Sequence, residues 1–368
     1  DLMLASSGGS HHIYMQGADL RFWDTTDRVT IKGGGNVGIG TTTPTERLDV
    51  VGNIRATGSI TGGTPMLTLV SGSCTAIQDA INALPASGGQ VIVQSGTYTC
   101  ATPILIDRND VDLRGQGPST ILRAGNGSNI PVLVAGQTVA VPTITRSRIR
   151  ISDILIDGNK DNQTYECMGG PCTSTNVLRN NGISLRKVQD VSVERVIVQN
   201  AISGGLVSEL GYRRLTVRDF TSSANKYDGL AAYQTENSAF SGLHLFDNNA
   251  AGLSFDIQFN DNLITDTTIV GSKDVGIFMR DSQDNVFSNL QIRSSTSHGV
   301  YLAQVDSDTT KPAAGNTFTG LMVSDSGGAG FWVNNQSCVN NIVCSSQFIR
   351  NASGSIVGSF QTCGNIYR

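Results

Sequence analysis

Apolar and polar side chains alternate in short segments that recur along the second half of the chain. Each segment follows a glycine and reads GISLR, GLVSE, GLAAY, GLSFD, GIFMR, GVYLA or GFWVN. The first and third residues after the glycine are large and apolar, except at Ser208 and Ala232. An alternation with a period of two is typical of a β-strand that buries one face in a core. The pattern therefore predicts one strand after each of these glycines.

These segments repeat at an almost constant distance. Successive glycines are separated by 23, 24, 23, 24, 23, 31 and 24 residues. A second strand recurs in each unit, as in NVFSNLQIRSS and NTFTGLMVSDS. A fixed period in the twenties, with strands and Asn/Gly/Ser corners but no helices, is typical of a solenoid. The sequence predicts an all-β fold, a right-handed parallel β-helix whose coils stack about 4.8 Å apart. The repeated glycines are Gly182, Gly205, Gly229, Gly252, Gly276, Gly299, Gly330 and Gly354.

A short helix is predicted where the solenoid begins. In the segment AIQDAINALPASGG, Ile77, Ile81 and Leu84 lie at helical spacing, and Pro85 follows. We expect this amphipathic helix at about residues 75–85. It would cover the first coil, whose apolar core and strand edges would otherwise be open to solvent. Residues 65–368 are then expected to form one β-helix domain.

Residues 1–64 follow a different pattern, with short strand-like runs broken by glycines. Within them, GNVGIGTTTPTERLDVVGNIRATG resembles a stretch of phage tail fibres and related surface fibres. The resemblance implies a fibre-like, glycine-rich stalk or adaptor ahead of a distal module, and such shafts are often trimeric. A glycine-rich segment of short strands cannot bury a core alone, so we expect a homotrimer. A plain glycine-rich linker is the alternative.

The predicted helix, the GTY that follows it and the segment ISDILIDGNKDN resemble the pectate-lyase-like superfamily. This superfamily includes polygalacturonases, alginate epimerases and many tailspikes, and the resemblance covers about residues 70–335. Within this superfamily, the sequence resembles most the catalytic modules of mannuronan C5-epimerases. The Tyr, Asp, His and second Asp that act in that family align with Gly204, Val207, Glu209 and Tyr233. None of the four is kept, so the resemblance implies the fold and not the epimerase reaction.

Composition and motifs exclude several classes of function. The net charge of −4, with no basic block, argues against nucleic-acid binding. No apolar run approaches the roughly 20 residues that a membrane-spanning helix needs. The glycines in 33–38 have the spacing of a dinucleotide-binding loop, but no strand–turn–helix pattern surrounds them. Asp157, Asn159 and Asp161 alternate as in a calcium loop, without its later Gly and Glu. We therefore expect neither a cofactor nor a metal.

The seven cysteines are an odd number, so at least one cannot pair within the chain. Two interpretations stay open. Cysteines in a solenoid can be small buried apolar residues. Alternatively, disulfides close both ends of the solenoid and one loop, which would imply an extracellular setting. Two cysteines flank the start of the solenoid, two share the loop CMGGPC and three lie near the far end: Cys74, Cys100; Cys167, Cys172; Cys338, Cys344, Cys363.

Candidate chemistry lies on the outward positions of the repeated strand. If the coils stack in register, the fourth residues after the glycines form one column, and aromatic second residues on three coils lie beside it. Exposed aromatic rings stack on sugars, and arginine binds a carboxylate through two parallel hydrogen bonds. We expect this face to bind a polysaccharide, acidic ones included, between walls formed by residues 158–181 and 305–317. The proposed binding residues are Arg186, Arg280, Phe278, Tyr301, Trp332 and Asn334.

Two carboxylates of the same column are the predicted acid–base pair. Glu209 and Asp256 lie two coils apart, or about 9–10 Å between their backbones. That spacing places their carboxyl groups near the roughly 6.5–9.5 Å separation of an inverting glycosidase. Tyr233 lies between them and completes the predicted catalytic set. The sequence thus favours a glycosidase of the tailspike or surface-fibre type, extracellular on a virion tail or a cell surface.

Two other functions stay open. In the first, the column is a solvated sheet face of a non-catalytic structural or adhesive fibre. In the second, the protein is a uronate polysaccharide lyase or epimerase. Arg186 or Arg280 would then neutralise the uronate carboxylate, and Tyr233 would exchange the proton.

Overall fold

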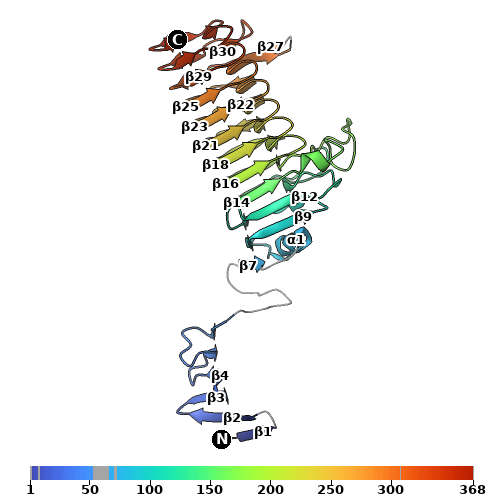
Figure 1. Cartoon of the computed structure of the whole chain (residues 1–368), viewed down its shortest axis with the longest axis vertical. Helices are drawn as coiled ribbons and strands as arrows, with labels where there is room; N and C mark the ends of the chain where they lie inside the picture. Colours follow the sequence, from blue (N-terminus) through green and yellow to red (C-terminus); the bar gives the residue numbers. More distant parts are fainter. Residues whose placement is uncertain (1, 7–8, 53–65, 70–72, 307, 368) are drawn as a thin grey trace. The chain divides into compact units, whose positions relative to one another are not determined.

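The computed structural model describes residues 2–6, 9–52, 66–69, 73–306 and 308–367 (Figure 1). The chain divides into two compact units, Asp1–Thr61 and Gly62–Arg368. The expected boundary at residues 64/65 lies outside the described residues. The roles expected for the two parts, a stalk and a polysaccharide module, stay predictions.

The first unit is a single small sheet, and its described residues form no buried apolar core. Its first four strands pair as an antiparallel meander, the fifth pairs antiparallel with the fourth, and the sixth lies parallel to the fifth. Among its described residues only Thr30 and Gly38 are buried. The strands are β1 (Leu2–Ser6), β2 (Gly9–Gln16), β3 (Asp19–Asp24), β4 (Thr26–Ile31), β5 (Val37–Ile39) and β6 (Leu48–Val50).

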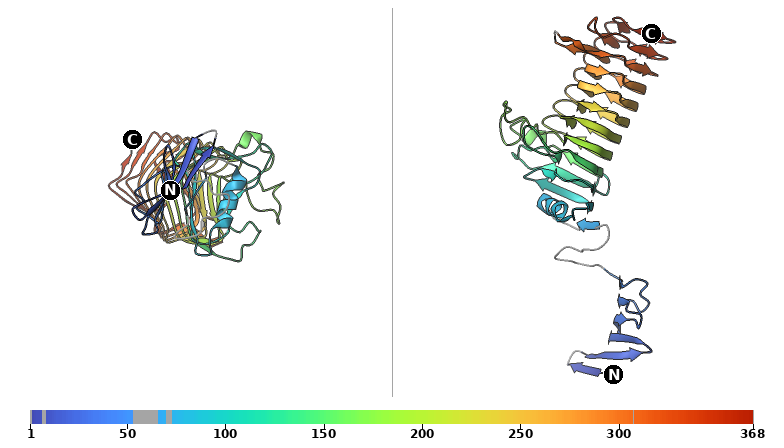
Figure 2. Two further views of the ribbon diagram at one scale, coloured as in Figure 1. Left: turned by 90° about the horizontal axis from the view of Figure 1, so that it is seen from below. Right: turned by 180° about the vertical axis from the view of Figure 1, so that it is seen from behind.

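The second unit begins with the predicted helix, α1 (Cys74–Ala83). The hydroxyl of Ser73 accepts the backbone N–H of Ala76 at 3.3 Å, which caps the helix start. Ile77 and Ile81 are fully buried against the first coils, so the amphipathic face covers the core as expected. Figure 2 shows α1 at the end of the stack of coils where the solenoid begins.

The second unit is the predicted right-handed parallel β-helix, with 29 strands in one continuous sheet. We call the strands that follow the repeated glycines the repeat strands. They are β15 (Ile183–Arg186), β17 (Leu206–Glu209), β19 (Leu230–Tyr233), β22 (Leu253–Asn260), β24 (Ile277–Gln283), β26 (Val300–Val305), β30 (Phe331–Val333) and β33 (Ile356–Val357).

The remaining strands complete the coils. Before the first repeat strand come β7 (Met66–Leu69), β8 (Gly89–Val93), β9 (Gly96–Cys100), β10 (Ile104–Ile106), β11 (Val111–Arg114), β12 (Thr120–Ala124), β13 (Leu133–Gly136) and β14 (Arg146–Asp157). The second strands of later coils are β16 (Val188–Gln199), β18 (Tyr212–Ser223), β20 (Thr235–Glu236), β21 (Ala239–Phe246), β23 (Leu263–Val270), β25 (Val286–Arg293), β28 (Thr317–Thr319), β29 (Met322–Ser324), β31 (Ile342–Cys344), β32 (Gln347–Ile349), β34 (Gln361–Cys363) and β35 (Ile366–Tyr367). Two insertions add the 3₁₀ helix Lys160–Asn162 and the hairpin strand β27 (Asp308–Ala314).

The repeat strands stack in the predicted register from β15 to β30, but at the last coil Phe331 pairs with Ile356, so Ser355 and not the predicted Gly354 aligns with Gly330. Arg186 pairs with Glu209, Tyr233 with Asp256, and Asp256 with Arg280. The first residue after each glycine from β15 to β30 is fully buried. The glycines from Gly182 to Gly330 are required by this stacking; a Cβ on Gly252, for example, would lie 2.9 Å from the carbonyl oxygen of Gly276. The alternating pattern therefore marks an inward column that forms the core and an outward column that faces the insertions.

Asparagines at one corner of the coils form a buried ladder. The amide nitrogen of Asn262 donates to Asn285, that of Asn285 to Asn316, and that of Asn316 to Asn341, at 3.0, 2.9 and 3.1 Å. Each receiving oxygen also accepts the backbone N–H of the preceding asparagine. Because all four side chains are at most 3% exposed, the ladder satisfies backbone groups that no solvent reaches.

Three disulfides join cysteines that lie close in the coils: Cys74–Cys100, Cys167–Cys172 and Cys344–Cys363. One ties α1 to the first coils and one ties the last coils together, so the disulfide interpretation holds for six cysteines. Cys338 is a buried free thiol, so the apolar interpretation holds for the seventh.

Replacing Asn285 by Ala should lower the free energy of unfolding by about 1–3 kcal/mol, because the buried N–H of Asn262 loses its acceptor. Replacing the exposed Gln336 by Ala should change it by no more than about 0.5 kcal/mol. Urea unfolding of both variants measures the difference. Equal effects would show that the ladder adds no stability.

Candidate functional site

The outward face of the repeat strands is more covered than the sequence predicted. The expectation that the outward positions are all exposed is wrong, because seven of them are less than a tenth exposed. Residues 137–140 lie over Arg186 of β15. Tyr233, Arg280 and the aromatic residues remain half-buried, and Asn334 is exposed. The buried positions are Ser184, Arg186, Val207, Ala231, Ser254, Asp256 and Ala303.

Arg186 has no exposed side-chain surface, so the prediction that it binds a sugar is wrong. Its Nε donates to Glu209 Oε1 at 2.6 Å. Its other nitrogens donate to the carbonyl oxygens of Gln137, Val139 and Ala140, at 2.7–3.2 Å. Arg186 therefore fixes the 137–140 segment on the coil and also holds the carboxylate of Glu209 in place. Glu209 itself keeps 29% of its side chain exposed.

Asp256 is held in a similar way by the arginine of the next coil. Arg280 donates from Nε to Oδ1 at 3.0 Å and from Nη2 to Oδ2 at 2.6 Å. The Asp256 side chain is 10% exposed and that of Arg280 is 30% exposed. The guanidinium also lies 5.7 Å from the ring centre of Phe278. Both carboxylates of the predicted catalytic pair are thus paired with arginines, and their catalytic role stays a prediction.

A cavity of about 240 Å³ opens on this face beside Glu209 and Tyr233. Its other walls come from the corner just before the repeat strands and from the 158–181 insertion. The sequence analysis did not identify the corner residues. The polar residues that line the cavity are Arg179, Asn181, Ser203, Glu209, Tyr227, Asp228 and Tyr233.

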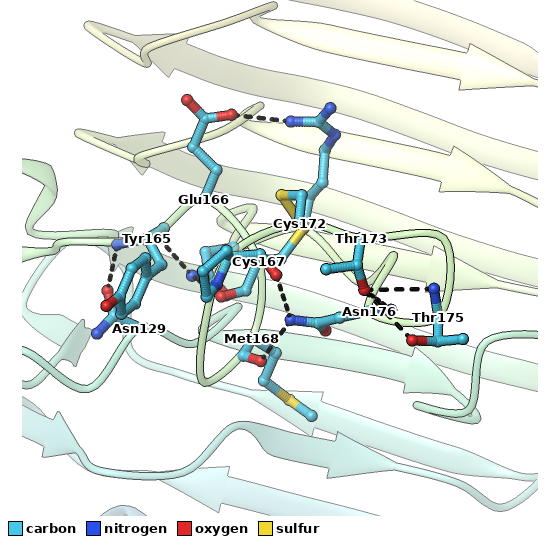
Figure 3. Close-up of a disulfide and its surroundings, with 12 residues drawn as sticks. Asn129, Tyr165, Glu166, Cys167, Met168, Cys172, Thr173, Thr175 and Asn176 are labelled. Carbon is cyan, nitrogen blue, oxygen red and sulfur yellow. Dashed lines mark hydrogen bonds and ion pairs between the residues drawn. A yellow bond between two sulfur atoms is a disulfide. The ribbon is translucent and has the colours of Figure 1, made fainter.

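The insertion that forms one cavity wall is tightly held. The disulfide Cys167–Cys172 closes its tip, and the side chain of Asn129 accepts the N–H of Tyr165 at 2.7 Å (Figure 3). Glu166 then joins the insertion to residues 226 and 227, two coils further along. It pairs with Arg179 at 3.0 Å, and it accepts Lys226 Nζ at 2.6 Å and the Tyr227 hydroxyl at 2.9 Å. The wall is therefore a fixed part of the site.

Asp228 is the carboxyl group that the sequence analysis missed. Its Oδ1 accepts the backbone N–H of Ala251 at 2.9 Å. Burial raises the pKa of Asp228 to about 6, with smaller contributions from Asp274 and Asp256. Burial, assisted by Asp228, also raises the pKa of Tyr233, so this hydroxyl stays protonated at neutral pH. The cavity thus combines a carboxyl that titrates near pH 6 with a neutral phenol and the carboxylate of Glu209.

The position of Asp228 in the repeat explains why it was missed. It directly precedes Gly229, whereas the alternation follows the glycines. Residues at this position contact the next coil: Asn181 Oδ1 accepts the N–H of Gly204 at 3.0 Å, and His298 Nδ1 accepts that of Ala329 at 2.9 Å. A polar residue just before a repeated glycine was the available signal.

Four aromatic rings form a patch on the later coils: Phe278, His298, Tyr301 and Trp332. Phe278 and Tyr301 stack with ring centres 5.8 Å apart, and His298 stacks on Tyr301 at 5.6 Å. His298 also meets Trp332 edge-on at 4.2 Å. Burial lowers the pKa of His298, and because Nδ1 is an acceptor, the neutral ring carries its proton on Nε2. The structure therefore adds His298 to the three predicted aromatic residues.

The described residues contain no group of three or more His, Cys, Asp or Glu side chains arranged to hold a metal ion. No helix in the described part of the chain is long and apolar enough to cross a membrane.

Comparisons with known proteins agree with the fold. The family described as right handed beta helix region matches residues 137–310 and 181–348. Mannuronan C5-epimerase AlgE1 of Azotobacter vinelandii is 26% identical over 219 residues, which are 57% of this chain and 15% of that protein. Curated relatives of this kind are matched over only 11–22% of their length.

Solved structures of other proteins share the fold of this chain. The A-module of mannuronan C-5 epimerase AlgE6 from A. vinelandii matches with a TM-score of 0.60 and 18% identity, covering 78% of this chain and 75% of that one. The Dettilon tailspike protein matches with a TM-score of 0.52 and 12% identity, covering 79% and 62%. At these identities the likeness shows the fold alone. The predicted resemblance to the pectate-lyase-like superfamily is confirmed at this level.

Replacing Arg186 by Met should lower the free energy of unfolding by about 3–5 kcal/mol, because Glu209 and three carbonyl groups lose a buried partner. Replacing Arg195 by Met breaks an exposed pair with Asp153 and should cost no more than about 1 kcal/mol. Chemical denaturation at pH 7 compares the two. A small loss for Arg186→Met would contradict its role in holding the 137–140 segment.

Replacing Asp228 by Asn should stabilise the protein at pH 7 but not at pH 4. The pKa of Asp228 is about 6 in the folded chain and ordinarily 3.8, so the folded state binds more protons between these values. The stability from this group is complete below pH 4 and is lost as the pH rises to about 6. At about 1.4 kcal/mol per unit, the variant should gain roughly 3 kcal/mol at pH 7. Urea unfolding at several pH values tests this, and a pH-independent difference would contradict it.

Proposed function

The chain belongs to the family of right handed beta helix regions, and from this premise we propose that it binds an extended polysaccharide along the outward face of its repeat strands. The observation that carries the proposal is the aromatic patch of Phe278, His298, Tyr301 and Trp332. The exposed parts of these half-buried rings offer apolar surface against which the C–H groups of a sugar can pack. The mannuronan epimerases to which the chain is similar are named for a polysaccharide substrate.

The length of this face suits a polymer rather than a single sugar. The register places Glu209 and Asn334 five coil steps apart, which is about 24 Å at the spacing of parallel strands. Arg280 lies between the cavity and the aromatic patch, and 30% of its side chain is exposed to donate hydrogen bonds. A bound chain would contact Arg280 and the patch, reach Asn334 at one end and enter the cavity at the other.

The setting proposed for this activity is extracellular, on a virion tail or a cell surface, as in a tailspike or surface fibre. Three disulfides support an oxidising compartment. A non-catalytic adhesive fibre is the second candidate, and the face would then serve for attachment alone. The cavity with its carboxyl groups favours depolymerisation over attachment alone.

Replacing Trp332 by Ala should weaken the binding of a polysaccharide ligand about tenfold, since one aromatic contact is worth roughly 0.5–1.5 kcal/mol beyond its buried area. A glycan array with acidic and neutral polysaccharides identifies the ligand, and calorimetry then gives the dissociation constants. Replacing Tyr367, an exposed aromatic residue of β35 outside the patch, by Ala should leave binding unchanged. If neither variant loses affinity, the patch is not the binding surface. If the parent binds no glycan, the proposal is contradicted.

We also propose that the protein is a homotrimer assembled through residues 1–52. The sheet of this unit has no buried apolar side chain among its described residues, and Leu2, Met3, Met15 and Phe22 are exposed. Packing three such sheets would bury these side chains. Light scattering should give three times the 38.8 kDa mass of one chain. Replacing Met15 and Phe22 together by Ser should shift the mass towards one chain. A single-chain mass for the parent would refute the trimer.

A further inference from the structure

We propose that Asp228 is the general acid and Glu209 the general base of a glycoside hydrolase site in the 240 Å³ cavity. The inference rests on the polysaccharide binding proposed above and names the reaction at one end of that face. It assigns the acid to a residue outside the predicted pair of Glu209 and Asp256.

The fold does not require a carboxyl group at position 228. Asp228 Oδ1 accepts the N–H of Ala251, and Asn181 makes the same contact with Gly204 two coils earlier. His298 makes it again with Ala329. An amide oxygen or an imidazole nitrogen can therefore accept the backbone N–H of the next coil, so this contact does not need a carboxyl group. Asp228 lines the cavity and keeps a second carboxyl oxygen that the corner contact does not use.

The charges around Asp228 favour its acid form. Burial is the largest influence on its pKa, and the negative charges of Asp274 and Asp256 act in the same direction. The hydrogen bond from Ala251 and the positive charge of Arg179 oppose them. The phenol of Tyr233, in the same cavity, carries no charge at neutral pH because its own pKa is raised. With a pKa of about 6, Asp228 holds a proton that it can donate to the glycosidic oxygen in weakly acidic solution.

Glu209 is suited to the opposite role. Buried Arg186 donates to its Oε1 at 2.6 Å and fixes the orientation of the carboxylate. The remaining 29% of the side chain that is exposed faces the cavity. Asp256 is less suited, because Arg280 binds both of its oxygens and its own backbone neighbour Ile257 donates to Oδ1. Asp256 therefore acts as a positioning residue for Arg280.

The reaction consumes one water for each bond cleaved. Asp228 donates its proton to the glycosidic oxygen as the bond between this oxygen and the anomeric carbon breaks. A water molecule attacks the anomeric carbon and gives a proton to Glu209. One product carries a new hydroxyl group and the other a new reducing end. The proton then leaves Glu209, and solvent reprotonates Asp228, so the site returns to its starting state.

The test is the Asp228→Asn variant, which can keep the contact with Ala251, as Asn181 does with Gly204, but cannot donate the proton. On a polysaccharide that the parent binds, release of reducing ends should fall by about 10²–10⁴-fold, with an unchanged dissociation constant. The matched control is Asp247→Asn, an exposed aspartate away from the cavity, which should cleave at the parent rate. The parent rate should also fall as the pH rises above about 6, where Asp228 loses its proton.

Each of the other outcomes would contradict one part of the proposal. If Asp228→Asn binds and cleaves like the parent, Asp228 is not the acid. If the products absorb as new double bonds, the reaction is elimination and not hydrolysis. If the parent binds a polysaccharide and releases no reducing ends, the hydrolase inference fails while the proposed binding stands. If the parent binds none of the polysaccharides tested, the proposed function itself fails.

Discussion

The structure depends on the in-register stacking of parallel coils. From Gly182 to Gly330, a carbonyl oxygen of the next coil would lie only 2.4–2.9 Å from a Cβ, so these turns pass this point with a glycine. Once the coils are in register, every position in the repeat becomes a column with neighbours about 4.8 Å away. Inside, the columns are apolar side chains and the ladder from Asn262 to Asn341. Outside, the same geometry pairs Arg186 with Glu209 and Asp256 with Arg280.

This stacking also decides where chemistry can occur. Oppositely charged side chains at such short spacing form ion pairs with one another, as Arg186 does with Glu209 and Arg280 with Asp256. The proposed acid, Asp228, lies outside this column, directly before Gly229, in a cavity to which the 158–181 insertion contributes Val177 and Arg179. Burial raises the pKa of this carboxyl group. Regular coils thus provide a long binding face, and the cavity beside Glu209 holds the proposed acid.

Much of this could be predicted from the sequence, and the exceptions have physical causes. Alternation and glycine spacing identified the strands, the register and the inward residues, because these depend on positions within one repeat. Helical spacing identified the cap at α1 for the same reason. The burial of Arg186 could not be predicted, since it depends on carbonyl groups of residues 137–140, which belong to another coil. Asp228 was not predicted because it directly precedes Gly229, whereas the alternation that identified the other residues follows the glycines.

The most direct measurement of the central claim is a crystal structure of the Asp228→Asn variant with a bound oligosaccharide that the parent recognises. We expect sugar rings from the cavity beside Glu209, past Arg280, to Trp332, with a glycosidic oxygen next to the side chain at position 228. An oligosaccharide bound instead in the polar groove between Lys187 and Lys311, or on the other faces of the coils, would contradict the account.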